Sequence, residues 1–277
     1  MKYCDLHCHS LASDGTASPA EVARIMKAAD SAAFAMTDHE TVWGNKEAQK
    51  EALKLGINFI PGVEMSCDFA GAELHIVGLF IEPDCSALTN VLELQREKRA
   101  VRNKKIFNKI ISLGIELDEK DFAESDVITR GHFAKKLHEL GYAKTVKEAY
   151  VNYLIEGGKA FVESERMSAK TAIETIKKAN GTSVFAHLNT YRIDAFKAAD
   201  ELQKMGLDGI EALYFEYSPE FSEKCIRFAE ARGFFMSGGS DFHGKLKPNI
   251  PCVGRSDGEK IPFSVYENLL EYRRKRC

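Results

Sequence analysis

The sequence lacks the marks of a secreted, membrane or polyanion-binding protein. Its seven cysteines are an odd number, and no two of them form a C-x-x-C pair. The longest apolar run, residues 76–81, is far shorter than the about 20 residues that span a bilayer. A net charge of −3 gives no general basic field, although it leaves room for a local cationic pocket that holds a small phosphorylated substrate. We expect a cytoplasmic protein with free, mostly buried thiols, no membrane contact and no implied protein partner.

The chain also has no charged-then-apolar leader, no internal repeat and no low-complexity tract. The missing leader argues against secretion. The basic residues 273–276 are expected to end a solvated helix and not to bind a polyanion. With 277 residues, the chain can form one large domain or one domain that carries an insertion.

What the sequence does contain is a repeated order of apolar stretch, polar cluster and helical pattern. Seven such apolar stretches lie near residues 2–6, 33–37, 57–63, 74–80, 182–186, 209–214 and 234–239. Helix starts are marked by capping pairs, Ser18 with Glu21 and Thr145 with Glu148. Strands that alternate with helices predict a parallel α/β fold, and a barrel is the arrangement we favour.

One segment breaks the alternation. Residues 88–161 have a helical pattern and no clear strand, beginning with one long amphipathic stretch over residues 87–114. We predict a barrel domain made of residues 1–87 and 162–277, and a helical insertion of residues 88–161 that covers the active site.

Polar clusters at the strand ends are the main functional signal, because reacting groups lie at the carboxyl ends of the strands in α/β barrels. Six of the eight histidines lie at or beside predicted strands, together with Glu64 and Asp241. They are His7, His9, His39, His75, His187 and His243. His75 lies early in its stretch, so it needs a shifted strand boundary. Imidazoles with carboxylates suit Zn, Mn or Fe, and nine candidate ligands, once Asp14 is counted, are too many for one ion.

The N-terminal cysteines are not expected to bind metal. Cys8 alternates with His7 and His9 and therefore faces the other side of the strand. Cys4 is offset from the histidines by an odd number of residues. We interpret both as core thiols; the alternative is a structural zinc protein built on Cys4 and Cys8.

The motifs "DLHCHS", "SDG", "TDHET", "GVEMS", "LHIVGLF", "FAHL" and "GGSDFHG" resemble those of the polymerase and histidinol phosphatase (PHP) superfamily of metal phosphoesterases. The resemblance covers nearly the whole chain. "ITRGHFAKKLHELGY", "AYVNYLIEGGKAFV" and "GKLKPNIPCVG" further resemble the subgroup of nucleoside 3′,5′-bisphosphate phosphatases and 5′-to-3′ exoribonucleases. The resemblance implies a distorted seven-stranded (β/α)7 barrel with two or three divalent metal ions.

The resemblance also implies how the ligands are divided among the metals. The first ion would be held by His7, His9, Glu64 and Asp241, the second by Glu64, His75 and His187, and the third by Asp14, His39 and His243. Some relatives carry His at the position of Asp14. Asp5 and Asp38 are expected either to orient histidine rings or to hold loops.

Substrate contacts are implied less directly. Arg130 and His132 in "TRGHF" would cover the mouth from the insertion, although Arg130 can also serve only the start of its own helix. Where many subgroup members have His-Pro-Gly after the fifth strand, this chain has His187-Leu188-Asn189-Thr190, and the nearby Arg192 would contact phosphate. Lys245 and Lys247 are expected to lie in a solvated loop.

These residues lead to a hypothesis for function. The protein would hydrolyse phosphate monoesters of nucleotides or 5′-phosphorylated short RNA, with Glu64, Asp241 and Arg130 as catalytic residues. A hydroxide that bridges two metals over Glu64 would attack phosphorus, Arg130 and Arg192 would hold the phosphoryl oxygens, and a bound water or His132 would protonate the leaving alkoxide. The alternatives are a histidinol-phosphate phosphatase, a cyclic-phosphate phosphodiesterase and a metal-binding accessory module without turnover.

Overall fold

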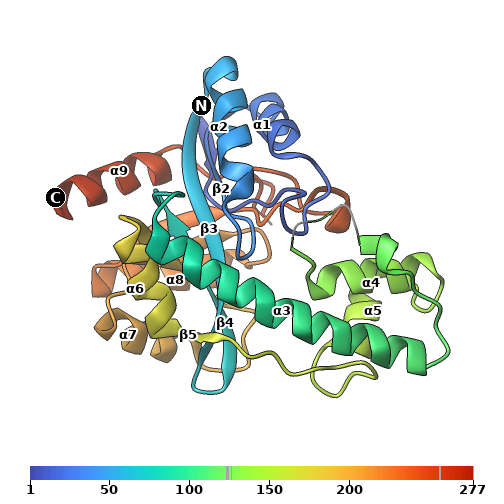
Figure 1. Ribbon diagram of the computed structural model, residues 1–277. Helices are drawn as coiled ribbons and strands as arrows, with labels where there is room; N and C mark the ends of the chain where they lie inside the picture. Colours follow the sequence, from blue (N-terminus) through green and yellow to red (C-terminus); the bar gives the residue numbers. More distant parts are fainter. Residues whose placement is uncertain (123–124, 126, 256, 277) are drawn as a thin grey trace.

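A mostly parallel sheet lies at the centre of the computed structural model (Figure 1), which describes residues 1–122, 125, 127–255 and 257–276. The strands are β1 (Tyr3–Asp5), β2 (Ser31–Met36), β3 (Asn58–Phe69), β4 (Ala72–Leu79), β5 (Met167–Ser168), β6 (Thr182–Phe185), β7 (Gly209–Tyr214) and β8 (Phe235–Gly239). They follow the order β1-β2-β3-β4-β6-β7-β8, and the two-residue β5 pairs with β3. The predicted α/β class is confirmed.

Strand β4 runs against its neighbours, so the expectation of a wholly parallel sheet was wrong at this strand. It is antiparallel to both β3 and β6. Only Ala70 and Gly71 connect β3 to β4, both with positive φ (54° and 81°), and a two-residue connection joins antiparallel strands only. The start of β4 therefore lies at the same edge of the sheet as the ends of the parallel strands.

Backbone hydrogen bonds join the segment after β1 to the end of β8 and the loop that follows it. The Leu6 N–H donates to the Gly238 carbonyl (3.0 Å), and the His9 N–H donates to Phe242 (2.9 Å). The Asp241 N–H donates to the His7 carbonyl (2.9 Å). These bonds bring the two ends of the sheet together next to the predicted site, while a regular closed barrel stays a prediction.

The helices follow the capping signals in the sequence. They are α1 (Pro19–Ala28), α2 (Trp43–Leu55), α3 (Ser86–Ser112), α4 (Arg130–Glu139), α5 (Val146–Ala149), α6 (Ala169–Lys178), α7 (Ala195–Lys204), α8 (Pro219–Arg232) and α9 (Ser264–Arg276), with the short turns η1 (Glu119–Phe122), η2 (Tyr150–Leu154) and η3 (Gly244–Leu246). Ser18 and Glu21 form the predicted capping box of α1, and Thr145 accepts a hydrogen bond from the Glu148 N–H at the start of α5. Gly233 ends α8 in the left-handed conformation that glycine adopts without strain.

The helical segment that interrupts the strands has its own small core. Side chains of α3, α4 and η2, among them Ile106, Phe133 and Leu154, form one cluster. The first half of α3 instead packs with the sheet, because Leu88 and Leu92 belong to the largest cluster of the molecule. Figure 1 shows α3 extending from the sheet to α4 and α5. The predicted boundary at residue 88 thus falls inside α3, and the division into domains stays a prediction.

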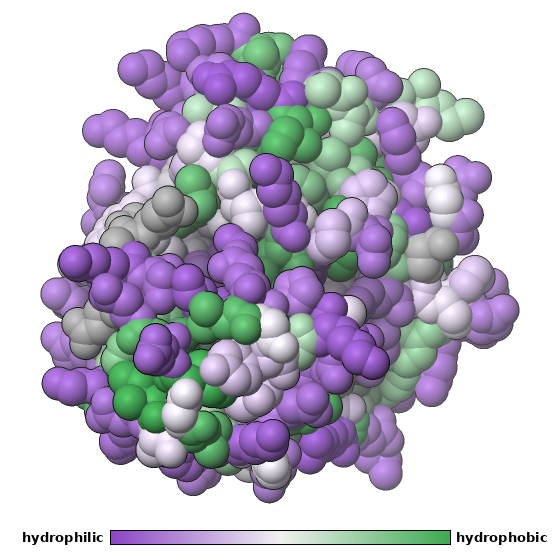
Figure 2. Space-filling model, turned by 90° about the vertical axis from the view of Figure 1, so that its right-hand side faces the viewer, coloured by the Kyte–Doolittle hydropathy of each residue, from purple (hydrophilic) through white to green (hydrophobic). Residues whose placement is uncertain are grey.

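The surface of this end of the molecule is largely hydrophilic. Figure 2 views the molecule from this side and shows scattered hydrophobic residues, with a larger green area in the lower part of the face. Exposed large apolar residues of the segment include Ile111, Leu113 and Leu140. Among the described residues, no helix combines the length and the apolar character needed to cross a membrane.

Candidate metal centre

All nine predicted ligands lie together at one edge of the sheet. His7, His9, His39, His187, Asp241 and His243 come from the loops just after parallel strands, Glu64 lies in the middle of the long strand β3, and Asp14 lies in the loop before α1. His75 lies in the second strand of the β3–β4 hairpin, near the start of β4, and is opposite Ser66 of β3. The antiparallel direction of β4 accounts for its early position, so no shifted boundary is needed.

Glu64 lies at the middle of the cluster and is fully buried. Five imidazoles have a ring nitrogen within 3.4 Å of its carboxylate oxygens. These distances are 3.4 Å for His7, 3.2 Å for His9, 3.1 Å for His39, 3.0 Å for His75 and 3.0 Å for His187. One carboxylate shared by five rings has the arrangement of a bridging ligand between cations.

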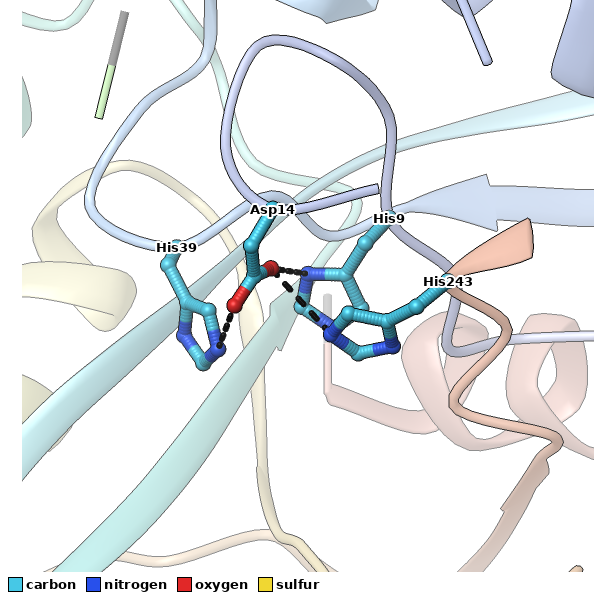
Figure 3. A group of neighbouring side chains, drawn as sticks. All are labelled: His9, Asp14, His39 and His243. Carbon is cyan, nitrogen blue, oxygen red and sulfur yellow. Dashed lines mark ion pairs between the residues drawn. The ribbon is translucent and has the colours of Figure 1, made fainter. Parts of the chain in front are cut away.

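Asp14 forms a second group with His9, His39 and His243. Figure 3 shows its carboxylate between three rings, and the shortest distance is 3.1 Å to Nε2 of His243. His9 and His39 lie 3.7 and 3.8 Å from the same carboxylate. The Thr129 hydroxyl, which caps α4, donates to Asp14 at 2.9 Å, so the helical segment reaches the centre here.

Asp241 joins the two groups. Its Oδ1 lies 3.3 Å from Nε2 of His9 and 3.3 Å from Nδ1 of His243. Its Oδ2 accepts hydrogen bonds from the Tyr214 hydroxyl (3.1 Å) and from the Lys247 ammonium (2.5 Å). Lys247 therefore belongs to the site, and the expectation that it lies in a solvated loop was wrong.

The donor atoms suit cations because several of them are buried and unpaired. Among the described residues, Nε2 of His7, Nε2 of His9, Nδ1 of His39 and one carboxylate oxygen of Glu64 are buried without a hydrogen-bond partner. Unsatisfied buried polar atoms are costly and call for a ligand. Four sets of three or four donors have their atoms within 4.8 Å of one another: His9, Asp14, His39 and His243; His7, Glu64 and His187; His7, His9 and Asp241; and His39, Glu64 and His75.

The carboxylates of the cluster are held in the charged form that binds metal. Burial alone would raise the pKa of Glu64, but the imidazoles of His39 and His7 hold it well below its usual range. Burial likewise opposes ionisation of Asp14, and His243 and His39 bring its pKa well below the usual value. The site is thus an anionic cluster inside an imidazole shell.

Side chains behind the ligands fix the orientation of the rings. Glu211 accepts from Nδ1 of His7 (3.0 Å) and from the His187 N–H (2.8 Å) and is buried in β7. Tyr191 lies 3.2 Å from Nδ1 of His187. The sequence analysis missed both residues. A lone acid within the apolar stretch at 209–214 was the available signal for Glu211, because a carboxylate is rarely buried unless it is paired.

Asp5 and Asp38 hold loops and do not touch the imidazole rings. Asp5 accepts from Ser240 and from the Val253 N–H (2.7 Å). Asp38 accepts from Ser10 and from the Ser13 hydroxyl (2.6 Å). Of the two roles left open by the sequence, the loop role is therefore the correct one for both.

Two of the predicted ligands have an unusual backbone conformation. The φ angles of His187 and Asp241 are 40° and 57°, and Glu40, next to His39, has 46°. Residues other than glycine adopt positive φ infrequently and at a cost, and such positions cluster at functional sites. Holding these side chains in the centre therefore costs folding free energy.

The predicted substrate contacts differ in position. Arg130 is buried and is linked to the centre through Glu73, which lies 3.1 Å from Arg130 and 3.8 Å from His75. His132 accepts a hydrogen bond at Nδ1 from the Thr129 N–H (3.0 Å) and so completes the cap of α4. The side chain of Arg192 is 74% exposed and pairs with Glu156.

The N-terminal cysteines are core thiols, as predicted. Cys8 is buried and its Sγ donates to the Ala35 carbonyl (2.8 Å), and Cys4 packs in another apolar cluster. Neither belongs to any of the four donor sets. The six cysteines among the described residues are free.

The chain is similar to known proteins over most of its length. The PHP domain family matches residues 5–217. A 5′-3′ exoribonuclease of Haemophilus influenzae is 35% identical over 91% of both chains, and a 3′,5′-nucleoside bisphosphate phosphatase of Chromobacterium violaceum is 33% identical over 88% of both. A solved structure from Bifidobacterium adolescentis, assigned as a metal-dependent phosphoesterase, aligns with a TM-score of 0.85 at 25% identity, covering 96% of this chain and 95% of that one.

Proposed function

The chain belongs to the PHP domain family and is a metal-dependent phosphoesterase, and we propose that its substrates are phosphate monoesters of nucleotides. Candidate substrates are nucleoside 3′,5′-bisphosphates, nucleoside monophosphates and 5′-phosphorylated short RNA. The names of the two relatives, a bisphosphate phosphatase and an exoribonuclease, support this class.

The observation that carries the proposal is the buried Glu64 carboxylate with five imidazoles within 3.4 Å. Two or three divalent ions, Mn, Fe or Zn, fit this donor set. We assign the first to His7, His9, Glu64 and Asp241, the second to Glu64, His75 and His187, and the third to Asp14, His39 and His243. Bound cations polarise phosphoryl oxygens and lower the pKa of bound water from about 15.7 to about 7.

The chain's own residues orient the reaction. Tyr214 and Lys247 hold Asp241 by hydrogen bonds to Oδ2, which leaves Oδ1 directed at His9 and His243. Because Nδ1 of His132 accepts the Thr129 N–H, we assign its ring proton to Nε2, from which it can donate a hydrogen bond to the departing oxygen while that oxygen takes its proton from water. We keep Arg130 as a phosphate contact, since it is connected to His75 through Glu73. Arg192 is the weaker proposal because it is exposed.

A substrate panel with the metal-loaded protein tests the proposal. Phosphate release is measured from adenosine 3′,5′-bisphosphate, 3′-AMP, 5′-AMP, a 5′-phosphorylated dinucleotide, histidinol phosphate and a cyclic phosphate. We expect the highest kcat/KM among the nucleotides. A higher value for histidinol phosphate or for the cyclic phosphate would overturn the nucleotide assignment, and no turnover of any ester would favour an accessory module.

A further inference from the structure

A groove with a volume of about 420 Å³ runs along one side of α3. The helix contributes Arg96, Arg99, Lys104 and Phe107, which lie on the same side of it because an α-helix has about 3.6 residues per turn. Phe133 of α4 also lines the groove. Its volume is within the range of pockets that hold small ligands. We call this feature the α3 groove.

The lining of the α3 groove combines aromatic rings with cations. Phe122 and Phe133 are buried, with ring centroids 4.7 Å apart, and Phe107 is half-buried. Arg96 is half-buried and Lys104 is exposed to solvent. Grooves that bind single-stranded nucleic acid have this composition, because aromatic rings stack on bases and cations attract the phosphates.

Two of the cations have no carboxylate partner. Among the described residues, Arg96 and Lys104 form no ion pair, whereas Arg99 pairs with Glu40. The Arg96 guanidinium donates instead to the backbone carbonyl of Glu40 (3.0 Å), a neutral oxygen that leaves its charge uncompensated. The groove therefore attracts phosphate locally, although the net charge of the whole chain is −3.

Trp43, the single tryptophan of the chain, is joined to the α3 groove by Arg96. It is the first residue of α2 and is 54% exposed. The guanidinium of Arg96 lies over its ring, 4.8 Å from the centroid, in a cation–π contact. Tryptophan is highly buried on average, so a ring that is exposed and held in place by a cation suits the stacking of a base.

Both walls of the groove are connected to the metal centre. On the α3 side, Arg96 contacts Glu40, which directly follows a predicted ligand. On the other side, the lining residue Ile128 precedes Thr129, whose hydroxyl donates to Asp14 at 2.9 Å. A substrate that reacts at the metals can therefore continue into the groove.

We propose that the α3 groove and Trp43 bind the nucleotides of a single-stranded RNA substrate that lie beyond the reacting phosphate. Trp43 stacks on a base, and Arg96 and Lys104 pair with phosphates. The strand is single because the bases of a duplex stack on one another and are not open to an aromatic side chain. The inference rests on the proposed function and makes it more specific, since an oligoribonucleotide then binds better than a mononucleotide.

The first test compares kcat/KM for a 5′-phosphorylated tetraribonucleotide with kcat/KM for adenosine 3′,5′-bisphosphate, using the metal-loaded protein. Trp43→Ala should lower the ratio of the two values by about fivefold or more, because stacking on an aromatic ring contributes at least this much per base. Trp43→Phe keeps an aromatic ring and should restore most of the ratio.

The charge of the groove is tested in the same assay. Lys104→Gln should also lower the ratio, because it removes a phosphate contact. Lys105→Gln is the matched control. Lys105 is equally exposed on α3, but at 3.6 residues per turn it lies on the opposite side of the helix from Arg96, so the ratio should stay unchanged.

The single tryptophan also gives a readout that does not depend on turnover. A base that stacks on Trp43 quenches its fluorescence, so a phosphorothioate-linked tetraribonucleotide, which resists hydrolysis, should quench the emission of the metal-loaded protein. 5′-AMP at the same concentration should not. The slope of log affinity against log salt concentration should become shallower by about 0.7 in Lys104→Gln and stay at the wild-type value in Lys105→Gln.

The outcomes separate the two proposals. A ratio that stays the same in Trp43→Ala and Lys104→Gln, in proteins with wild-type melting temperature and metal content, overturns the RNA groove and leaves the proposed function intact. Equal quenching by 5′-AMP and the tetraribonucleotide also overturns it, since Trp43 would then contact only the nucleotide at the metals. A wild type that hydrolyses no nucleotide overturns the proposed function itself.

Discussion

At the scale of single residues, Glu64 is the position on which the centre depends. Its two oxygens face five imidazoles from different parts of the sheet, and no other described acid touches so many of the predicted ligands. A neutral amide has the same size but only one acceptor and no charge.

Glu64→Gln should therefore lose phosphoesterase activity by at least about a thousandfold and bind fewer ions. Elemental analysis of the purified variant, beside a turnover assay, checks both parts. Full metal content with near-normal activity would contradict the role of Glu64 as a shared ligand.

Glu211 acts on the metals through the rings that it holds. It accepts hydrogen bonds from Nδ1 of His7 and from the backbone N–H of His187. Mutation of a residue that orients a metal-binding histidine commonly lowers metal affinity by about 10- to 100-fold. Glu211→Gln should weaken metal binding by about tenfold or more, measured by competition with a chelator. Glu230→Gln is the matched control, since Glu230 lies exposed on α8 and should not alter the affinity.

At the scale of elements, the start of α4 connects the helical segment to the metal centre. Thr129 caps the helix by accepting from the Gly131 N–H (3.0 Å), and the same hydroxyl donates to Asp14. Thr129→Ala should lower stability by about 1 kcal/mol and reduce occupancy of the site at Asp14. Thr129→Ser retains the hydroxyl and should preserve both. Thermal unfolding and metal analysis measure the two effects, and equal behaviour of the two variants would contradict the link.

The elements also show what the sequence can reveal. Apolar stretches that end in histidine or acid residues predicted seven of the described strands and the polar side chains that meet at one edge of the sheet, because those side chains lie in or next to the strands. The direction of β4 was not predicted, since an apolar stretch reads the same in both directions and only the Ala70-Gly71 connection decides. Contacts such as Glu211 with His7 and Lys247 with Asp241 join residues 204 and 6 positions apart, and neither pairing has a spacing rule.

At the scale of the whole molecule, the metals should be part of what keeps the protein folded. The donor atoms come from segments between residues 7 and 243, and several of them are buried and unpaired without cations. A ligand that binds only the folded state stabilises it by about 2.7 kcal/mol at a hundred times its Kd.

Loading the chelator-treated protein with Mn or Zn should therefore raise Tm by about 5 to 10 °C, which differential scanning calorimetry can record. The same addition should have a much smaller effect on Glu64→Gln. An unchanged Tm in the wild type would mean that the donors are balanced in some other way.

The hydrogen bonds between residues 6–9 and 238–242 also have a consequence for synthesis. His7 and His9 leave the ribosome early, whereas Asp241 and His243 are translated more than 230 residues later, after about 10 to 50 s at ordinary elongation rates. During this interval the nascent chain presents His7 and His9 without the carboxylate of Asp241, so the set proposed for the first ion is incomplete. The sets proposed for the first and third ions are thus complete only after Asp241 and His243 have been translated, and a transcript truncated before them would lack one donor of each.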